Sequence, residues 1–278
     1  MSDASRRRPR ISAGTPNVAR MNDYFIGGKD NFAADREAVE KVLALAPEAR
    51  AMGEQVQAFR ERVVRHLVEQ GVRQFVHIGS WLPTARNAHE IAQSLAPDAH
   101  VVYVADDPVV LSHARAILAT NEQTGVVEGD VLHPDELVDD PGLRRLIDLD
   151  RPVAVLIFGS LQYIPDSDGP FESVARLCER LPAGSHLGLT HAVFDTRPDV
   201  AEQIADIYRE ALGRPDGGPR TRDQAARFFD GLELVDPGFV YARQWRPETP
   251  VSEQEAKKTW VAAGLARKGP AQGPTSSP

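Results

Sequence analysis

Two hydrophobic periods alternate along the central part of this sequence. Short β-branched runs bounded by turn residues predict buried strands over residues 74–79, 100–105, 125–130, 153–159 and 185–192. Amphipathic stretches between and beyond them predict helices over residues 84–96, 108–119, 170–181, 198–212 and 221–230. Because strands and helices that alternate at this spacing form βαβ units, we expect a mostly parallel sheet with helices on both faces.

The segments on either side of this alternation follow other patterns. Residues 32–71 have the pattern of at least two helices, divided near Pro47, and we expect them to cover the carboxyl ends of the strands. Residues 232–245 and 259–266 are strand-like with no helix between them, which predicts an antiparallel pair. A parallel sheet that ends in an antiparallel pair is the layout of class I methyltransferases, so the pattern predicts that α/β fold.

Local signals predict where some helices begin and how the chain is divided. Thr84 and Thr221 are candidate N-caps, and Pro108 suits a first turn. The sequence shows no internal repeat and no long linker. We therefore expect one folded unit between polar tails, with a disordered tail over 1–14, a helical lid over 15–72, a Rossmann-like domain over 73–267 and a second disordered tail over 268–278.

Composition excludes several classes of function. The 278 residues are 42% hydrophobic and 26% charged, and 32 basic against 40 acidic residues leave a net charge of −8, which argues against nucleic acid as the main partner. No apolar run approaches the roughly 20 residues that span a bilayer, and none follows the basic N-terminus as in a secretory signal. The single cysteine, Cys178, rules out an internal disulfide or a cysteine-based zinc site. We expect a cytoplasmic protein without a metal, a nucleic-acid partner or a membrane partner.

Several candidate site residues follow the first two strands, where ligands bind in open α/β sheets. In "HIGSWLPT", Gly79 permits a tight turn, and the backbone after it could hold an anionic group, although a lone glycine is also common at a strand end. After the second strand, Asp106 is a candidate acceptor for ribose hydroxyls. Asp107 precedes Pro108 and could instead cap the helix.

Further candidates follow the third, fourth and fifth strands. Asp130 could accept from an adenine amino group, or it could be a turn aspartate. Ser160, Gln162 and Tyr163 could face a ligand, although Tyr163 could also belong to the core. His191 would lie at the same edge of the sheet. There it is either a hydrogen-bonded structural residue or a general base, since its pKa is tunable near neutrality.

The segment "RMNDYFIGGKDNF" (20–32) is unusual because it is both polar and aromatic. It is too polar and too rich in glycine to predict the start of a core helix, and Gly27 and Gly28 should interrupt any helix. Such segments are often binding loops, and the alternative is a polar connector with a helix cap. Asp23 and Tyr24 in this segment are candidate catalytic residues.

These segments together resemble an actinobacterial family of S-adenosylmethionine-dependent methyltransferases that was formerly a domain of unknown function. The resemblance covers about 16–268 and rests on "ARMNDYFIGGKDNFAADREA" (19–38), "LPT" (82–84), "DPVVL" (107–111), "LIDLDRPVAVL" (146–156), "PAGSHLGLTHA" (182–192) and "RFFDGLELVDPG" (227–238). It implies a Rossmann-like, mostly parallel seven-stranded sheet with an antiparallel last strand. It also implies S-adenosylmethionine as the cofactor. The implied cofactor-binding positions are His77, Gly79, Ser80, Trp81, Asp106, Asp107, Asp130, Ser160 and Gln162.

The sequence departs from the family pattern in three motifs. "HIGSWLPT" stands where "DIGTGLPT" is typical, "VADDP" where "VDNDP" is typical, and "LQYIPD" where "LHFVPD" is typical. His77 therefore replaces an acid, and Ser80-Trp81 replaces Thr-Gly. Ala105 replaces the usual ribose acid, and Gln162 replaces a histidine. A protonated histidine would repel the ammonium group of the cofactor, whereas Trp81 could stack on a flat ligand.

Three hypotheses about function follow. The first is a methyltransferase that acts on a small molecule of secondary metabolism, with His191, Asp23 or Tyr24 as candidate catalytic residues. The second is a non-methylating enzyme, such as a cyclase, lyase or isomerase, on the same scaffold. The third is a non-catalytic ligand-binding descendant. The sequence predicts neither the substrate nor the oligomeric state.

Overall fold

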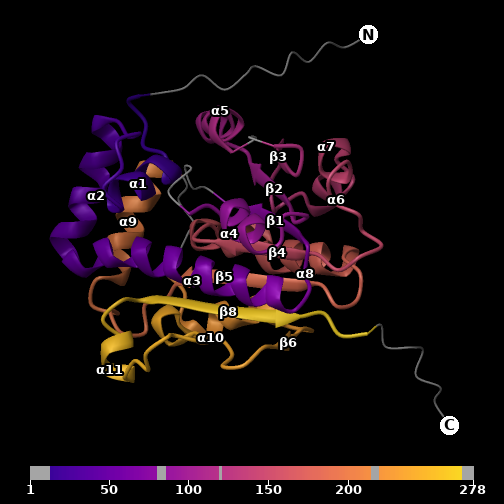
Figure 1. The fold of residues 1–278 in the computed structure, drawn as a ribbon. Helices are drawn as coiled ribbons and strands as arrows, with labels where there is room; N and C mark the ends of the chain where they lie inside the picture. Colours follow the sequence, from indigo (N-terminus) through magenta and orange to yellow (C-terminus); the bar gives the residue numbers. More distant parts are fainter. Residues whose placement is uncertain (1–12, 80–85, 119–120, 214–218, 271–278) are drawn as a thin grey trace.

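The protein is described from a computed structural model, which covers residues 13–79, 86–118, 121–213 and 219–270. In these ranges a single mixed sheet has the order β3-β2-β1-β4-β5-β8-β6, and β7 also pairs with β8 (Figure 1). The parallel strands are β1 (Gln74–Ile78), β2 (His100–Ala105), β3 (Thr124–Glu128), β4 (Ala154–Phe158) and β5 (His186–Ala192). The five strands predicted from hydrophobic runs are therefore confirmed.

The end of the sheet is antiparallel, as predicted, but it contains one more strand than expected. β8 (Val261–Arg267) runs antiparallel to β5. The segment predicted as one strand over 232–245 forms two short strands, β6 (Glu233–Leu234) and β7 (Val240–Tyr241), and both pair with β8. A turn separates them, in which the Gly238 N–H donates to Val235 O over 2.8 Å and Gly238 adopts a positive φ of 92°.

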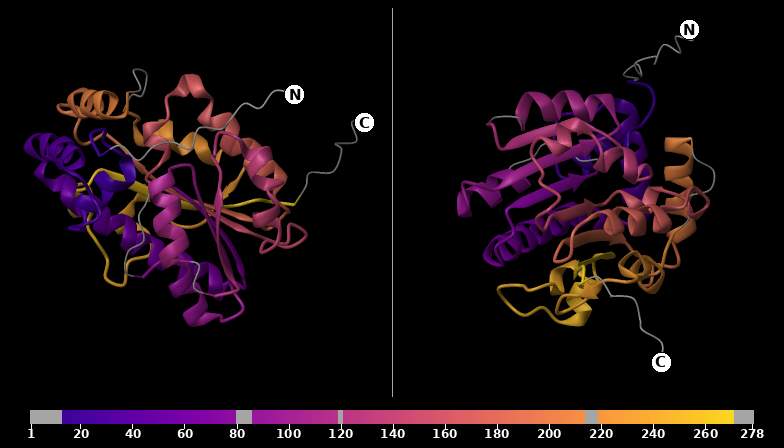
Figure 2. Two further views of the ribbon diagram at one scale, coloured as in Figure 1. Left: turned by 90° about the horizontal axis from the view of Figure 1, so that it is seen from above. Right: turned by 90° about the vertical axis from the view of Figure 1, so that its right-hand side faces the viewer.

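Helices cover both faces of the sheet (Figure 2). On one face, α3 (Arg50–Glu69), α4 (Ala88–Leu95) and α5 (Pro108–Ile117) pack on alternate strand residues such as Phe75, Tyr103 and Phe158. On the other face, α6 (Pro134–Val138), α7 (Pro141–Arg144) and α8 (Pro170–Arg180) pack on the residues between them. This alternation follows from the two-residue period of a strand that is buried on both sides.

The N-terminal segment forms helices at the carboxyl ends of the parallel strands. α1 (Val18–Phe25) and α2 (Ala33–Leu45) share an apolar cluster with α9 (Ala201–Leu212), and these helices lie together at one end of the sheet (Figure 1). A 3-10 turn, η1 (Pro47–Ala49), divides α2 from α3, which confirms the predicted division near Pro47. The remaining helix pair, α10 (Arg222–Ala226) and α11 (Glu253–Ala256), flanks the antiparallel strands.

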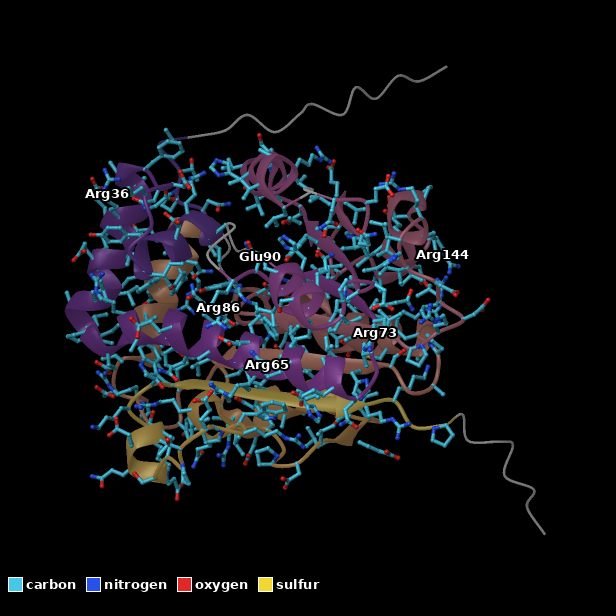
Figure 3. All side chains as sticks on the ribbon, in the orientation of Figure 1. Arg36, Arg65, Arg73, Arg86, Glu90 and Arg144 are labelled. Carbon is cyan, nitrogen blue, oxygen red and sulfur yellow. The ribbon has the colours of Figure 1, made fainter. Side chains whose placement is uncertain are left out.

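The structure corrects one predicted helix start. α4 begins at Ala88 rather than at Thr84, which lies outside the described residues. Asn87 is the N-cap, and its backbone N–H donates to Glu90 Oε2 over 2.6 Å in a capping box, which stabilises this start. Just before it, Arg86 forms an ion pair with Glu61 of α3, and Arg86 and Glu90 are labelled in Figure 3.

The prediction of a loop over the polar segment 20–32 is wrong for its first half, which belongs to α1. The Asn17 side chain caps this helix by accepting from the N–H groups of Ala19 and Arg20. The buried Arg20 donates through Nε to Asp35 Oδ2 over 2.7 Å, so its charge is compensated inside the protein. The helix ends before Gly27, which has a positive φ of 78°, and the loop that was expected occupies only the second half.

Within the described ranges, no helix combines the length and apolar character that crossing a bilayer would require. The same ranges contain no group of three or more His, Cys, Asp or Glu side chains that could hold a metal ion.

Candidate functional site

A pocket lies where the carboxyl ends of β4 and β5 meet the N-terminal helices, and its empty space, including the part that is open to solvent, is about 1020 Å³. We call it the β4–β5 pocket. Gly159 and Ala192 contribute its floor, since they follow or end these two strands. Its walls come from α1, α2, α3, α9, the segments after β4 and β5, the segment before α10 and the start of β8. The lining includes Asn22, Phe25, Val42, Met52, Gly53, Val56, Gln162, Tyr163, Phe194, Ile204, Tyr208, Arg209, Leu212, Arg220, Trp260 and Val261.

Aromatic side chains dominate the β4–β5 pocket. The rings of Tyr163 and Tyr208 lie 4.8 Å apart, and those of Phe194 and Trp260 lie 5.0 Å apart, both as centroid distances. Burial raises the pKa of Tyr208 well above its ordinary value and also raises the pKa of Tyr163. Both phenols are therefore protonated at neutral pH, and the walls carry no charge from them.

Two buried polar atoms in these walls have no hydrogen-bond partner among the described residues. They are the indole Nε1 of Trp260, a side chain only 2% exposed, and the amide Oε1 of Gln162. An unpaired buried donor or acceptor costs about 1–3 kcal/mol, so each of these atoms favours a ligand that pairs with it. Gln162 and Tyr163 were predicted to face a ligand, and both line this pocket.

Arg220 holds the segment after β4 in place. Its Nη1 donates to Leu161 O over 2.8 Å, its Nη2 donates to Ile164 O over 2.7 Å, and it forms a 2.6 Å ion pair with Asp166. The two carbonyls flank Gln162 and Tyr163, so Arg220 positions both. Sequence reasoning missed this residue, because no local pattern links it to a segment more than fifty positions earlier.

His191 lies behind the pocket wall rather than in it. The side chain is 1% exposed, its Nδ1 is 2.6 Å from Ala192 O, and its Nε2 is 3.2 Å from Arg220 Nη1. These contacts assign the proton to Nδ1 and make Nε2 an acceptor. Burial, reinforced by Arg220, lowers the pKa of His191 to about 3, so the ring is neutral at physiological pH.

Asp23 and Tyr24 are not among the residues that line the pocket, whereas their neighbours Asn22 and Phe25 are. Asp23 Oδ2 accepts from Asp30 N and from Asn31 Nδ2, each over 2.8 Å, so it organises the loop after α1. Tyr24 donates its hydroxyl to Glu40 Oε1 over 2.6 Å, and this hydrogen bond raises the pKa of Tyr24.

The close approach at Gly28 explains the second glycine of this loop. A Cβ at Gly28 would lie 1.9 Å from Asp23 Oδ1, and the Gly28 N–H donates to Asp23 O over 2.8 Å. Only glycine therefore fits beside the carboxylate without displacing it.

The predicted cofactor residues Asp106, Asp107 and Asp130 follow the carboxyl ends of β2 and β3. Asp106 is exposed directly after β2. Asp107 caps α5, since its Oδ1 accepts from Val109 N over 2.8 Å and Val110 N over 3.0 Å, and its Oδ2 accepts from Asn17 Nδ2 over 2.7 Å. Asp130 Oδ1 accepts from Leu132 N over 2.9 Å, while its side chain stays 33% exposed. These contacts agree with the alternative predictions, in which Asp107 caps a helix and Asp130 is a turn residue.

Two other predicted cofactor positions, Gly79 and Ser160, follow the carboxyl ends of β1 and β4. Gly79 donates its N–H to Val104 O over 3.2 Å, and Ser160 Oγ donates to Phe158 O over 3.2 Å. Ser80 and Trp81 lie outside the described residues.

His77 is buried on the face of the sheet. Its ring lies 5.5 Å from that of Tyr103 and 5.3 Å from that of Phe158 as centroid distances, beside a second, small pocket that Arg60 and Gly79 also line. Neither ring nitrogen has a partner in the described part of the chain. Burial, together with the nearby Arg60, lowers the pKa of His77 to about 3. The ring is therefore neutral, and it would not repel a bound ammonium group as a protonated histidine would.

Comparisons with known proteins agree with this architecture. A family model described as S-adenosyl methyltransferase matches residues 4–269. A solved DUF574 family protein from Streptomyces avermitilis is 36% identical with a TM-score of 0.87, and the match covers 93% of this chain and 100% of that chain. A solved protein from Thermobifida fusca, described as a proposed methyltransferase, is 39% identical with a TM-score of 0.86 and covers 92% and 96% respectively.

More distant likeness extends to the fold alone. An O-methyltransferase family protein from Burkholderia thailandensis is 12% identical with a TM-score of 0.52, and the match covers 94% of this chain and 66% of that chain. A comparison with curated proteins gave no match. Since the family model spans nearly all of the sequence and two solved structures are more than one-third identical over more than nine-tenths of it, the chain belongs to the S-adenosyl methyltransferase family.

Proposed function

We propose that this protein binds S-adenosylmethionine at the carboxyl ends of β1 to β4 and transfers a methyl group to a small molecule of secondary metabolism held in the β4–β5 pocket. The observation that carries the proposal is the position of this pocket. It lies at the edge of the sheet where open α/β folds bind ligands, and the N-terminal helices cover it. The family supplies the expectation of the cofactor.

The residues at this edge fit the chemistry of that cofactor. Asp106 and Asp130 offer carboxylate oxygens to ribose hydroxyls and to an adenine amino group, and both side chains reach solvent. Gly79 and Gly159 directly follow β1 and β4 and have no side chains, so a ligand can approach the backbone there. The neutral state of His77 removes the electrostatic objection to a bound ammonium group.

When bound, the cofactor supplies an electrophilic methyl group on a sulfonium. The contribution of the protein is then to hold the acceptor in line and to exclude water, which is mainly a matter of positioning. In this proposal residues 15–72 act as a lid, through Asn22, Phe25 and Met52 in the pocket wall. Arg220 positions Gln162 and Tyr163, and His191 supports Arg220 as a neutral acceptor. Asp23 holds the loop after α1.

A calorimetric titration with S-adenosylmethionine and S-adenosylhomocysteine tests the proposal. We expect micromolar binding of both and a higher melting temperature in their presence. Asp106→Ala should weaken binding about ten- to a hundredfold, as expected for the loss of a charged hydrogen bond. Asp98→Ala is the matched control, because Asp98 precedes β2 and so lies at the opposite edge of the sheet, beside Arg73 at 3.4 Å. Absence of any heat or melting shift at millimolar concentration would refute the proposal.

Ala105 favours a second candidate function on the same scaffold. It occupies the position of the usual ribose acid and is buried at the end of β2, while Asp107 is committed to capping α5. This arrangement would suit a non-methylating enzyme or a ligand-binding protein that uses the β4–β5 pocket alone. Ligand binding to the pocket together with no binding of either cofactor form would support this candidate.

A further inference from the structure

We infer that the ligand of the β4–β5 pocket is a neutral, mainly apolar ring compound that carries a hydroxyl group. That this ligand is the methyl acceptor rests on the proposed function. The inference itself depends on three properties of the pocket walls, which are their aromatic surface, their two unpaired polar atoms and their charge.

The aromatic surface favours a ring. Tyr163 and Tyr208 meet at an interplanar angle of 48°, and Phe194 and Trp260 meet at 62°, so each pair presents both ring faces and ring edges. Phe25 adds a further ring from α1. Planar ligands gain offset or edge-to-face contacts on such walls beyond the burial of apolar area.

The two unpaired polar atoms favour a hydroxyl group. Trp260 Nε1 can only donate a hydrogen bond, and Gln162 Oε1 can only accept one. A ligand therefore pairs with both atoms when it offers one acceptor and one donor. A hydroxyl is the smallest neutral group that supplies both, and an ether or a bare hydrocarbon leaves at least one of these atoms unpaired.

The charge of the walls excludes ionised ligands. The described lining contains no Asp, Glu, Lys or His, so an ammonium group would have no counter-charge there. Its two guanidinium groups are already engaged. Arg209 pairs with Glu202 over 3.2 Å and with Asp206 over 2.5 Å, and Arg220 pairs with Asp166 over 2.6 Å. A carboxylate would therefore also be buried without a dedicated partner, which is costly.

Calorimetry with four bicyclic probes tests the ligand class. The probes are naphthol, methoxynaphthalene, naphthoate and naphthylmethylammonium, each titrated with and without S-adenosylhomocysteine. We expect naphthol to bind at least tenfold more tightly than the two ions, and methoxynaphthalene, which cannot donate to Gln162, to bind about three- to tenfold more weakly than naphthol. An ion that binds as tightly as naphthol would overturn the inference.

Two variants locate the binding. Trp260→Phe and Gln162→Leu should each weaken naphthol binding about tenfold. Trp245→Phe is the matched control, because Trp245 is also fully buried with an unpaired indole N–H, but it packs against Phe59 at 5.2 Å in another core and does not line this pocket. If Trp260→Phe fails to fold, Gln162→Leu decides alone. Unchanged naphthol affinity in Gln162→Leu would overturn the inference.

The titrations with S-adenosylhomocysteine separate this inference from the proposed function. Binding of S-adenosylhomocysteine without selectivity for naphthol would refute the ligand class and leave the proposed function standing. Selective naphthol binding, sensitive to Trp260→Phe, without any cofactor binding would support the ligand class and refute the proposed function.

Discussion

Nη1 of Arg220 lies 3.2 Å from Nε2 of His191, and both side chains are at least nine-tenths buried. The histidine is neutral and accepts a hydrogen bond from the cation, while its Nδ1 faces Ala192 O. The pair joins the end of β5 to the start of α10 and, through Arg220, to the segment that carries Gln162. The pair therefore couples the predicted base to the shape of the β4–β5 pocket.

Arg220→Met should be strongly destabilising, because it removes several buried hydrogen bonds and leaves the carbonyls of Leu161 and Ile164 without this donor. We expect the free energy of unfolding to fall by about 3–5 kcal/mol, measured by urea denaturation. Arg222→Met is the control, since Arg222 is only half-buried and stacks on Tyr241 at 5.5 Å. Equal losses in the two variants would contradict the role assigned to Arg220.

Stability should fall in acid because of His77 and His191. Burial lowers the pKa of each ring from 6.5 to about 3 in the folded chain. Between these values the unfolded chain takes up protons that the folded chain does not, so the free energy of unfolding decreases as pH falls from 6.5 towards 3. Each pH unit below 6.5 corresponds to about 1.4 kcal/mol. At pH 5 each histidine therefore lowers the free energy of unfolding by about 2 kcal/mol relative to neutral pH.

His77→Phe tests this pH dependence. The substituted ring keeps the packing against Tyr103 and Phe158 and removes the titrating group. We expect the loss of stability between pH 7 and pH 5 to be about 2 kcal/mol smaller than in the wild type, from denaturation at each pH, because His191 and His186, whose pKa burial also lowers, keep their share of it. If His77→Phe loses as much stability between pH 7 and pH 5 as the wild type does, His77 does not contribute to the pH dependence as expected.

Gly28→Ala should disorganise the loop after α1. The added Cβ would lie 1.9 Å from Asp23 Oδ1, and moving this carboxylate breaks its hydrogen bonds from Asp30 N and Asn31 Nδ2. We expect a loss of about 1–3 kcal/mol and faster amide hydrogen exchange in residues 26–31. Gly14→Ala is the control, because a Cβ there meets nothing within 4 Å. Unchanged exchange in Gly28→Ala would argue against the anchoring role of Asp23.

The adjacent aspartates after β2 should separate stability from cofactor binding. Asp107→Ala removes the cap of α5 and the acceptor for Asn17 Nδ2, so we expect a loss of about 1–2 kcal/mol in thermal or urea unfolding. Asp106→Ala should cost less stability but more cofactor affinity in the titration. The reverse order in either measurement would mean that the roles of the two carboxylates are exchanged.

The strands and most helices could be predicted from the sequence, because buried strands and amphipathic helices have different hydrophobic periods. β1, β2 and β5 match the predicted runs within one residue at either end. The prediction failed where a polar stretch of sequence is helical in the structure. Segment 20–32 was predicted as a loop, but Arg20 is helical because Asp35, fifteen positions later, compensates its charge. The family and its fold could also be predicted, since they follow from motifs that are contiguous in the chain.

The chemistry of the site was decided by tertiary structure. The sequence determined that Asp106, Asp130, Gln162 and His191 follow the carboxyl ends of strands, because strand ends can be predicted from local pattern. It could not determine that Arg220 donates to His191, that Asn17 donates to Asp107, or that Trp260 lines the pocket and has an unpaired, buried N–H. These relationships join residues far apart in the chain, and burial, charge and hydrogen-bond supply are set only when packing brings them together.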